Sequence, residues 1–458
     1  MGTTYDVRIH KSEVYKGTRT TTHYVRWSVG GRRWREGFRV RALAESFRAE
    51  LVTATGRGEA FDIGTGRPVS MGREQRDMSW YEFACAFADM KWPRAAATTR
   101  RTNAEALTAA TVALFATAKG APDGQVVRAA LTRWGFNTAR RQDPNQPVRI
   151  ADALRWVERH TVAVSYLAKP FVLRPMLDAL ATRLDGTPYA PSVVNRRRKI
   201  LGTAMEYAVE LKLLTTNPIP ALKWTAPRTV HTVDRRSVAN PVQVRSLLAA
   251  VSVQQRSGPR LVAFFACLYF AAMRPEEAVA LAKHNLSLPE KGWGELTIDT
   301  AEPYAGREWT DSGNNRDRRQ LKQRARGESR TVPCPPELTA HLHNHIRTFG
   351  TAPGGRLFTG ERNAGELPKL TITRAWKRAR AATFAPEVAA GPLARTPYDL
   401  RHAAVSTWLG GGVPATTVAA WAGHSVEVLL KIYAKCLDGE TTAVQRRIEA
   451  ALGHLPPG

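Results

Sequence analysis

The excess of positive charge is the feature of this sequence that most limits what the chain can fold into. The 458 residues include 67 Lys and Arg but only 40 Asp and Glu, so the formal net charge is +27. Such an excess repels itself in a compact state unless a polyanion neutralises it, and duplex DNA carries one charge for about every 1.7 Å of its axis. Nucleic acid is therefore the leading candidate partner. The alternative is that the positive charge has no specific partner and only keeps the protein soluble.

Composition excludes several other classes of protein. Hydrophobic residues make up 43% of the chain and include 12 Trp, enough for packed cores, and the length predicts two to four domains. The four cysteines contain no C-x-x-C pair, which argues against a zinc or redox centre and fits a reducing cytoplasm. The N-terminus has no apolar signal segment, and the longest apolar stretch, 261–273, is too short to span a membrane. We expect a cytoplasmic, nucleoid-associated protein without membrane contact.

The first seventy residues have the pattern of a small sheet followed by a helix. Apolar and polar residues alternate over 24–29, and Gly30-Gly31 can form a two-residue hairpin turn. From 41 to 55 the apolar residues recur every four positions, as on one face of a helix. The strands are expected at 5–10, 24–29 and 34–40, and the Gly/Pro-rich stretch 56–72 at the linker that leaves this module.

Arginines crowd this predicted three-stranded sheet. A basic sheet backed by a helix can place one face in a DNA groove. The alternative is that the arginines lie on a face exposed to solvent and bind nothing. The candidate DNA contacts are Arg26, Arg32, Arg33 and Arg35.

The stretch 79–220 has a helical pattern and predicts a domain of four or five helices. Ser79 and Glu82 form a capping-box pair that begins the first of them. The last helix, expected from Val193 to Leu214, begins with four cations that lie on either a phosphate-facing or a solvated surface: Arg196, Arg197, Arg198 and Lys199. Residues 221–238 resemble an extended linker, and Asn240-Pro241 begins the next domain.

Four short stretches of the C-terminal part carry residues suited to phosphate chemistry. Each has an ordinary structural explanation when taken singly. The segment 311–330 contains seven Lys or Arg and three Asp or Glu, which is the profile of a hairpin or a mobile basic loop near DNA. The stretches are MRPEE with Arg274 and Glu277, LKQRAR with Lys322, Arg324 and Arg326, YDLRH with Tyr398 and Arg401, and WAGHS with His424, followed by Tyr433.

Taken together and in this order, the four stretches resemble the tyrosine recombinase family. The family pattern is Arg, Lys, His-x-x-Arg, His or Trp, and Tyr. The segments VRWSVGGRRW, LKQRARGESRTVPCPPEL, PYDLRHAAVSTWL and WAGHSVEVLLKIYAK are similar to phage-type integrases of actinobacterial phages and integrative elements. The resemblance covers the whole chain.

The resemblance implies a role for each residue. Tyr433 attacks the scissile phosphate and forms a 3′-phosphotyrosyl bond, as in type IB topoisomerases. Arg274 and Arg401 bind the phosphate oxygens, Lys322 protonates the departing 5′ oxygen, and His424 donates a hydrogen bond to the phosphate. Glu277 is placed one helical turn from Arg274 and can hold that guanidinium.

One position departs from the family pattern. This chain has Tyr398 where the family has the His of His-x-x-Arg. Tyrosine is neutral at physiological pH and a poor base, so the general-base role of that His is not carried over to it. We expect an active site in which this role is altered and Tyr398 donates a hydrogen bond to phosphate. The sequence does not assign the role to His402.

The sequence therefore predicts a multidomain protein that is mainly α with small β. An arm-type DNA-binding module is expected at 1–70, a helical, SAM-like core-binding domain at 76–225 and an α+β catalytic domain at 238–458. The predicted function is site-specific recombination for integration or excision of a mobile element, by a homotetramer on duplex DNA with core and arm sites. A directionality factor is a possible partner, and no metal or other cofactor is expected. The alternatives are a DNA-binding relative that has lost catalysis and a topoisomerase without sequence preference.

Overall fold

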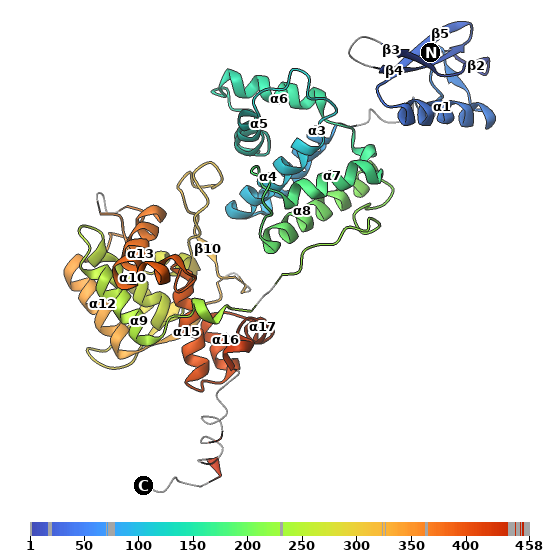
Figure 1. The fold of residues 1–458 in the computed structure, drawn as a ribbon. Helices are drawn as coiled ribbons and strands as arrows, with labels where there is room; N and C mark the ends of the chain where they lie inside the picture. Colours follow the sequence, from blue (N-terminus) through green and yellow to red (C-terminus); the bar gives the residue numbers. More distant parts are fainter. Residues whose placement is uncertain are drawn as a thin grey trace.

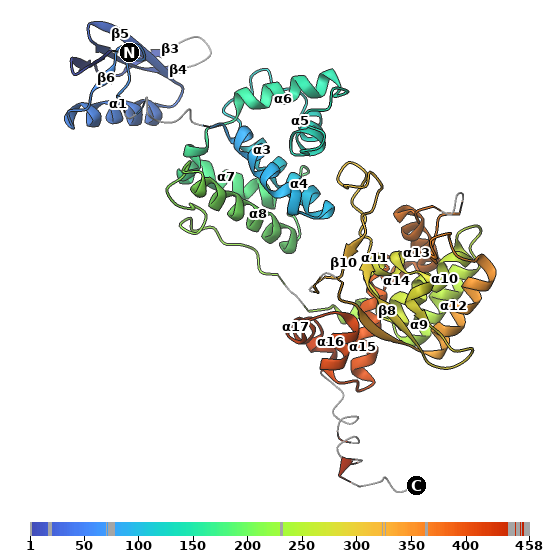
Figure 2. The same cartoon turned by 180° about the vertical axis from the view of Figure 1, so that it is seen from behind.

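The computed structural model describes residues 2–16, 21–69, 71, 78–229, 232–322, 324–325, 327–361, 365–437, 445, 449 and 451–452. Buried apolar side chains form three separate clusters along the chain. The first runs from Val25 to Phe61, the second is built mainly on residues 80–219, and the third runs from Val233 to Tyr433. Figures 1 and 2 show the corresponding parts in blue, in cyan to green, and in yellow to red.

The N-terminal module is a small antiparallel sheet covered on one face by a helix. The central strand pairs with one strand along one edge and with two short strands in succession along the other. Val25, Trp27 and Val29 alternate toward the helix and form the core of the module. The elements are β1 (Thr3–Thr4), β2 (Val7–Ile9), β3 (Glu13–Lys16), β4 (Thr21–Val29), β5 (Arg32–Phe38), α1 (Arg41–Gly56) and β6 (Phe61–Asp62).

The prediction that 56–72 is a linker is wrong for most of that stretch. Strand β6 pairs with β1, and Phe61 is fully buried in the core of the module. Arg67 forms an ion pair of 2.7 Å with Glu36, and the indole N–H of Trp27 donates to the Gly66 carbonyl. Glycine and proline here shape tight turns that return the chain to the sheet, so composition alone did not separate a folded turn from a linker.

The second part is helical and contains six α-helices within residues 78–229, more than the four or five that the sequence predicts. Ser79 caps the first helix, and its capping box with Glu82 is present as predicted. The α-helices are α3 (Trp80–Lys91), α4 (Ala97–Ala113), α5 (Gly124–Ala130), α6 (Val148–His160), α7 (Pro170–Ala181) and α8 (Pro191–Glu210), with shorter turns η1 (Trp92–Arg94), η2 (Leu131–Gly135) and η3 (Val164–Ala168).

The third part is a helical body with small antiparallel sheets on one side. Asn240 caps α9 with a capping box to Gln243, as the Asn-Pro pair predicts. Strands β7 (Leu286–Ser287), β8 (Gly294–Ile298) and β11 (Arg330–Cys334) form one sheet, and β9 (Thr300–Ala301) pairs with β10 (Arg319–Gln320). The α-helices are α9 (Pro241–Ser252), α10 (Gly258–Phe270), α11 (Pro275–Ala280), α12 (Pro336–Phe349), α13 (Lys369–Thr383), α14 (Pro386–Ala390), α15 (Tyr398–Gly410), α16 (Ala415–Ala422) and α17 (Val426–Leu437), with turns η4 (Arg235–Ser237) and η5 (Lys283–Asn285).

A hairpin joins the second and third parts. Residues 302–318, between β9 and β10, extend from the C-terminal body to α4 (Figures 1 and 2). Trp309 at its tip is only 1% exposed and belongs to the helical cluster, where its ring lies 6.0 Å from that of Trp92. Arg100 of α4 bonds both carboxylate oxygens of Asp311 and the carbonyl oxygen of Trp309. The first part of the basic segment 311–330 is therefore packed against protein.

The observed architecture confirms the predicted fold class, which is multidomain and mainly α with small sheets. In the described part of the chain, none of the helices combines the length and the apolar character needed to cross a membrane.

Removing the Trp309 side chain should release the hairpin from the helical part. Truncating a buried tryptophan to alanine costs about 3–5 kcal/mol, and this loss weakens the docking of the hairpin. We expect Trp309→Ala to speed amide exchange of residues 302–318 and to increase the radius of gyration in solution scattering. Arg307→Ala, at an exposed position of the same hairpin, is the matched control and should change neither. Unchanged exchange in Trp309→Ala would contradict the docking.

Candidate active site

The first part of the site is a carboxylate held between two guanidinium groups. Glu277 is 1% exposed and accepts from Nη1 of Arg274 at 2.8 Å, and from Nη1 and Nη2 of Arg330 at 2.9 and 2.6 Å. Glu277 lies on α11 and Arg274 is the residue that caps it, so the predicted pair one turn apart is present. Arg330 begins β11 and also donates to the carbonyl oxygen of Trp421. Both arginines are buried.

The pKa of Glu277 reflects these contacts. Burial raises the pKa of this carboxyl, but the charges and hydrogen bonds of Arg330 and Arg274 lower it by a larger amount. The resulting pKa is about 2, below the usual value of 4.5. Glu277 is therefore ionised at every physiological pH, and it holds both arginines in fixed orientations.

Arg401 is the second part of the site and is completely buried. It lies on α15 and donates to the carbonyl oxygen of Ala272 and, at 2.6 Å, to that of Ala422. Within the described residues no carboxylate forms an ion pair with it, and its Nε–H has no hydrogen-bond partner. Burial and the charge of Arg274 lower the pKa of this guanidinium, although arginine stays protonated. A buried cation without a paired anion is costly, which marks this position as a place for an anionic ligand.

His424 lies beside Arg401 and has one unused ring nitrogen. Its Nε2 is 2.8 Å from Nη2 of Arg401, which can only donate, so Nε2 accepts and the ring proton is on Nδ1. Burial, together with Arg401 and Arg274, lowers the pKa of His424 to about 3, so the ring is neutral. Nδ1 is buried and has no partner among the described residues. The Nδ1–H group of His424 can therefore donate a hydrogen bond to an oxygen of a ligand.

Two backbone positions allow these side chains to converge. Gly423 ends α16 with φ of +65°, and a Cβ there would lie 3.3 Å from Nη1 of both Arg274 and Arg330. The carbonyl of Gly423 accepts from Arg274 at 2.7 Å. Ala272, whose carbonyl accepts from Arg401, has φ of +46°, which is unfavourable for a residue with a Cβ. Strain of this kind is concentrated at functional sites.

Tyr433 of α17 lies in the core next to these groups. Its side chain is 0% exposed, and its hydroxyl oxygen is 2.8 Å from Nδ1 of His402. The ring of His424 lies 6.3 Å from that of Tyr433. The predicted nucleophile is therefore close to the arginine and histidine groups, but a scissile phosphate can reach its oxygen only if α17 or its neighbours shift.

Lys322 lies at the mouth of the same region. It follows β10, is exposed, and lines a cavity of about 440 Å³ together with Arg274 and Glu277. Thr98 of α4 lines this cavity too, so the helical part closes one side of it. An exposed lysine on the rim of an arginine-lined cavity can reach a bound backbone and give up a proton.

Tyr398 occupies the first turn of α15, half-buried, with its ring 5.1 Å from that of His402. It also lines a neighbouring cavity of about 310 Å³ with Tyr304 and Lys369. The structure places it near the site without showing a hydrogen bond from its hydroxyl among the described residues.

The arginines of the N-terminal sheet do not all share one face. Residues paired across strands lie on the same face, so Arg26 and Arg35 lie together, and Arg33 lies opposite Ser28 on that face. Arg32 pairs with Val29, on the face that carries the core, and stacks on Trp34. Because side chains alternate along a strand, Arg32 lies on the opposite face from Arg26, Arg33 and Arg35. Arg26 is also paired with Glu13.

The other predicted DNA contacts include both exposed and half-buried side chains. Arg196 and Lys199 at the start of α8 are exposed, whereas Arg197 and Arg198 are half-buried. Arg197 stacks 4.0 Å from the ring centre of Tyr189 and donates to the Leu180 carbonyl. Arg324 is half-buried and bonds Glu328, and Arg326 lies outside the described residues.

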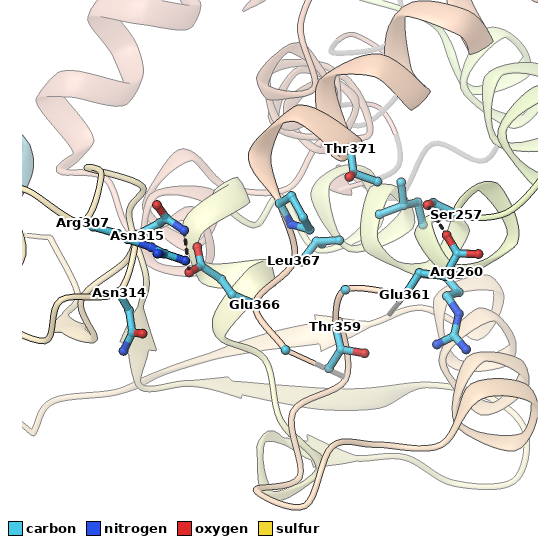
Figure 3. A pocket seen from close by; sticks show the side chains of 14 residues that line it. Ser257, Arg260, Arg307, Asn314, Asn315, Thr359, Glu361, Glu366, Leu367 and Thr371 are labelled. Carbon is cyan, nitrogen blue, oxygen red and sulfur yellow. Dashed lines mark hydrogen bonds between the residues drawn. The ribbon is translucent and has the colours of Figure 1, made fainter. Parts of the chain in front are cut away.

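A larger cavity, of about 580 Å³, lies elsewhere. It is lined by Arg307, Asn314 and Asn315 of the hairpin, by residues 359–361 and 365–368, and by the start of α10. Figure 3 shows Arg260, Arg307, Glu361 and Glu366 around it. None of the six predicted catalytic residues is among the described residues that line it. Size therefore does not identify the chemical centre of this protein.

Sequence reasoning missed Arg330 and the hairpin contacts, and it left the role of His402 unassigned. The buried face of β11 carries Arg330, Val332 and Cys334. A charged residue that alternates in step with two apolar ones indicates a buried charge, and this pattern could have identified Arg330 from the sequence. The pairing of His402 with Tyr433 depends on how α15 and α17 pack, and the sequence carries no indication of it.

No model of a known protein family matches the chain, and no curated protein matches it by sequence. Its fold is similar to those of several solved structures. The Tn1549 transposon integrase with transposon right-end DNA has a TM-score of 0.49 at 13% identity, over 72% of this chain and 99% of that one. The XerH site-specific recombinase bound to difH has a TM-score of 0.48 at 11% identity, over 82% and 97%. A lambda integrase tetramer on a Holliday junction has a TM-score of 0.48 at 12% identity, over 90% and 95%.

In fold, the chain is similar to solved DNA integrases and recombinases. At these identities the likeness concerns the fold alone.

Neutralising Glu277 should destabilise the third part of the chain. Glu277→Gln leaves two buried guanidinium groups without their carboxylate, and breaking a buried ion pair in this way costs about 3–5 kcal/mol. Urea unfolding at pH 7 measures the loss. Glu276→Gln, at the half-buried neighbouring position, should have a much smaller effect.

The pH dependence gives a second readout of the same carboxylate. Because folding lowers the pKa of Glu277 from 4.5 to about 2, its contribution is complete above pH 4.5 and is lost as the pH falls toward 2. That contribution is about 3 kcal/mol in the wild type and should be absent in Glu277→Gln. Equal acid sensitivity of the two proteins would contradict the assignment.

Proposed function

We propose that this chain is a site-specific tyrosine recombinase, which cleaves and rejoins DNA strands through a 3′-phosphotyrosyl intermediate. One observation carries the proposal: the Arg401–His424 pair, next to Tyr433, has two buried N–H donors without partners among the described residues. These donors and the buried positive charge suit a phosphodiester, and the neighbouring tyrosine supplies a nucleophile.

The charge balance of the cluster supports the same ligand. Arg274, Arg330 and Arg401 contribute three positive charges, Glu277 contributes one negative charge, and His424 is neutral. Two positive charges remain. A phosphodiester carries one negative charge, and the pentavalent transition state of its cleavage carries about two, so the site is better matched to the transition state than to the ground state.

The proposed chemical steps assign one role to each group, once a shift of α17 or its neighbours has admitted the phosphate to Tyr433. The oxygen of Tyr433 attacks phosphorus, and the bond from phosphorus to the 5′ oxygen breaks. Arg274, Arg401 and Nδ1 of His424 stabilise the charge on the non-bridging oxygens, while Lys322 gives its proton to the departing 5′ oxygen. Attack by a 5′-hydroxyl on the phosphotyrosyl bond reverses these steps and rejoins a strand. The protein's own cations supply the electrostatic stabilisation in this scheme.

The rest of the chain would supply DNA recognition. We assign arm-site binding to residues 1–70 through Arg26, Arg33 and Arg35, and core-site binding to 76–225 through Arg196 and Lys199, with catalysis in 238–458. Integration or excision of a mobile element by a homotetramer, with a directionality factor and a nucleoid-associated location, is part of this proposal. The solved lambda integrase is a tetramer on a Holliday junction.

Tyr433→Phe should abolish covalent adduct formation on a nicked suicide substrate while leaving DNA affinity nearly unchanged, because the hydroxyl supplies the nucleophile and little binding. Loss of the hydroxyl also leaves Nδ1 of His402 without its partner, at a cost of about 1–3 kcal/mol, so thermal unfolding is measured in parallel. Tyr398→Phe is the matched control and should still form the adduct. An adduct in Tyr433→Phe would refute the assignment. No adduct in the wild type would favour a relative that binds DNA without cleaving it.

Lys322→Ala should slow cleavage by about 10²–10⁴-fold, the usual contribution of a general acid. A substrate with sulfur in place of the bridging 5′ oxygen should restore the rate, because a thiolate leaves without protonation. Arg319→Ala is the control, because Arg319 is a cation that lines the same cavity but cannot act as an acid. If this variant cleaves more slowly, the rate should fall by the same factor on the oxygen and the sulfur substrate. Failure of the sulfur substrate to rescue Lys322→Ala would remove lysine from the acid role.

A further inference from the structure

The proposed reaction needs a group that takes the proton of Tyr433, and the family resemblance does not provide one. The family has a histidine at the position of Tyr398, and a tyrosine hydroxyl is a poor base at neutral pH. A proton acceptor must therefore be sought among the groups in contact with the Tyr433 hydroxyl.

We propose that His402 accepts the proton of Tyr433 as the phenol attacks. The hydroxyl oxygen of Tyr433 lies 2.8 Å from Nδ1 of His402, within the distance required for direct proton transfer. The inference rests on the proposed recombinase function and adds the base to it.

The contact joins two helices that are separate in sequence. His402 lies on α15 directly after Arg401, which binds His424, and Tyr433 lies on α17. One short helical segment thus carries both a guanidinium for the phosphate and an imidazole for the nucleophile. The rings of His402 and Tyr433 lie 5.7 Å apart, and the ring of Tyr398 lies 5.1 Å from that of His402.

The protonation state of His402 suits this role. Burial lowers the pKa of His402, Asp399 opposes this and Arg401 adds to it, so the imidazole is neutral at physiological pH. The groups that face it are Tyr398, Asp399 and Arg401 from α15, Tyr433 from α17, and His424 from the turn before α17. With Nδ1 accepting from the phenol, the ring proton lies on Nε2.

The step balances within the site. The O–H bond of Tyr433 breaks and its proton goes to Nδ1 of His402, which becomes an imidazolium. The phenolate oxygen forms the bond to phosphorus, and the bond to the 5′ oxygen breaks as Lys322 releases its proton to that oxygen. In the rejoining reaction His402 returns the proton to the departing phenolate.

The test compares His402→Asn with the wild type in single-turnover cleavage of a nicked suicide substrate. Asparagine keeps a hydrogen-bonding group near the position of Nδ1 but cannot take a proton at neutral pH. We expect cleavage to slow by about 10²–10⁴-fold with DNA affinity and thermal unfolding nearly unchanged. His284→Asn makes the same change at an exposed histidine and should cleave normally.

The pH profile separates a base from a positioning contact. The wild-type rate should fall on the acid side as His402 becomes protonated, and this limb should be absent in His402→Asn. Because the pKa of His424 is about 3, a limb above that pH does not come from His424. In addition, nitrogen NMR of the free wild-type protein should find the ring proton of His402 on Nε2.

The outcomes distinguish this inference from the function on which it rests. Adduct formation by the wild type together with wild-type cleavage and an unchanged pH profile in His402→Asn would overturn the role of His402 and leave the recombinase intact. Faster cleavage by the variant would also overturn it, since the contact would then restrain the nucleophile. Absence of any wild-type adduct would overturn the proposed function itself.

Discussion

The Glu277 carboxylate is the group on which the arrangement of this site depends. It is a single buried negative charge bonded to Arg274 of the α11 cap and to Arg330 of β11. These arginines in turn donate to the carbonyl oxygens of Gly423 and Trp421, so the carboxylate connects α11, the sheet and the end of α16. Because an ionised carboxylate is retained in the core only when it is fully paired, each element is held at the distance that the pairing requires.

The same arrangement leaves the site with more positive than negative charge. Glu277 bonds Arg274 and Arg330, whereas the hydrogen-bond partners of Arg401 among the described residues are two carbonyl oxygens and His424. A protein selected for stability alone would not be expected to bury a cation in this way. The cost is understandable if a phosphate completes the site, since the binding of an anion then supplies the missing partner.

Contacts between the parts of the chain bear on the site as well. The 302–318 hairpin leaves the C-terminal body between β9 and β10 and ends in the helical core, with Trp309 buried there. Lys322 follows β10 directly, and its cavity includes Thr98 of α4. The position of the proposed acid therefore depends on how the helical part is docked, which would connect the proposed binding of DNA by that part to the proposed chemistry.

The sequence by itself determined the elements and the residue types. Alternation and four-residue periodicity located the N-terminal sheet and α1, and caps located α3 and α9. The order of Arg274, Lys322, Arg401, His424 and Tyr433 predicted the chemistry that is proposed for this chain. These properties are local, because propensity, capping and periodicity act over one or two turns. A family pattern likewise needs only residue order.

Only the tertiary structure decided which groups touch. The return of 57–69 to the N-terminal sheet, the burial of Trp309 in another part of the chain and the pairing of Arg330 with Glu277 all join residues far apart in sequence. So does the contact of His402 with Tyr433, which the change at position 398 makes important. Contacts of this kind follow from how helices and strands pack, and packing is set by the sum of many side chains rather than by any local pattern.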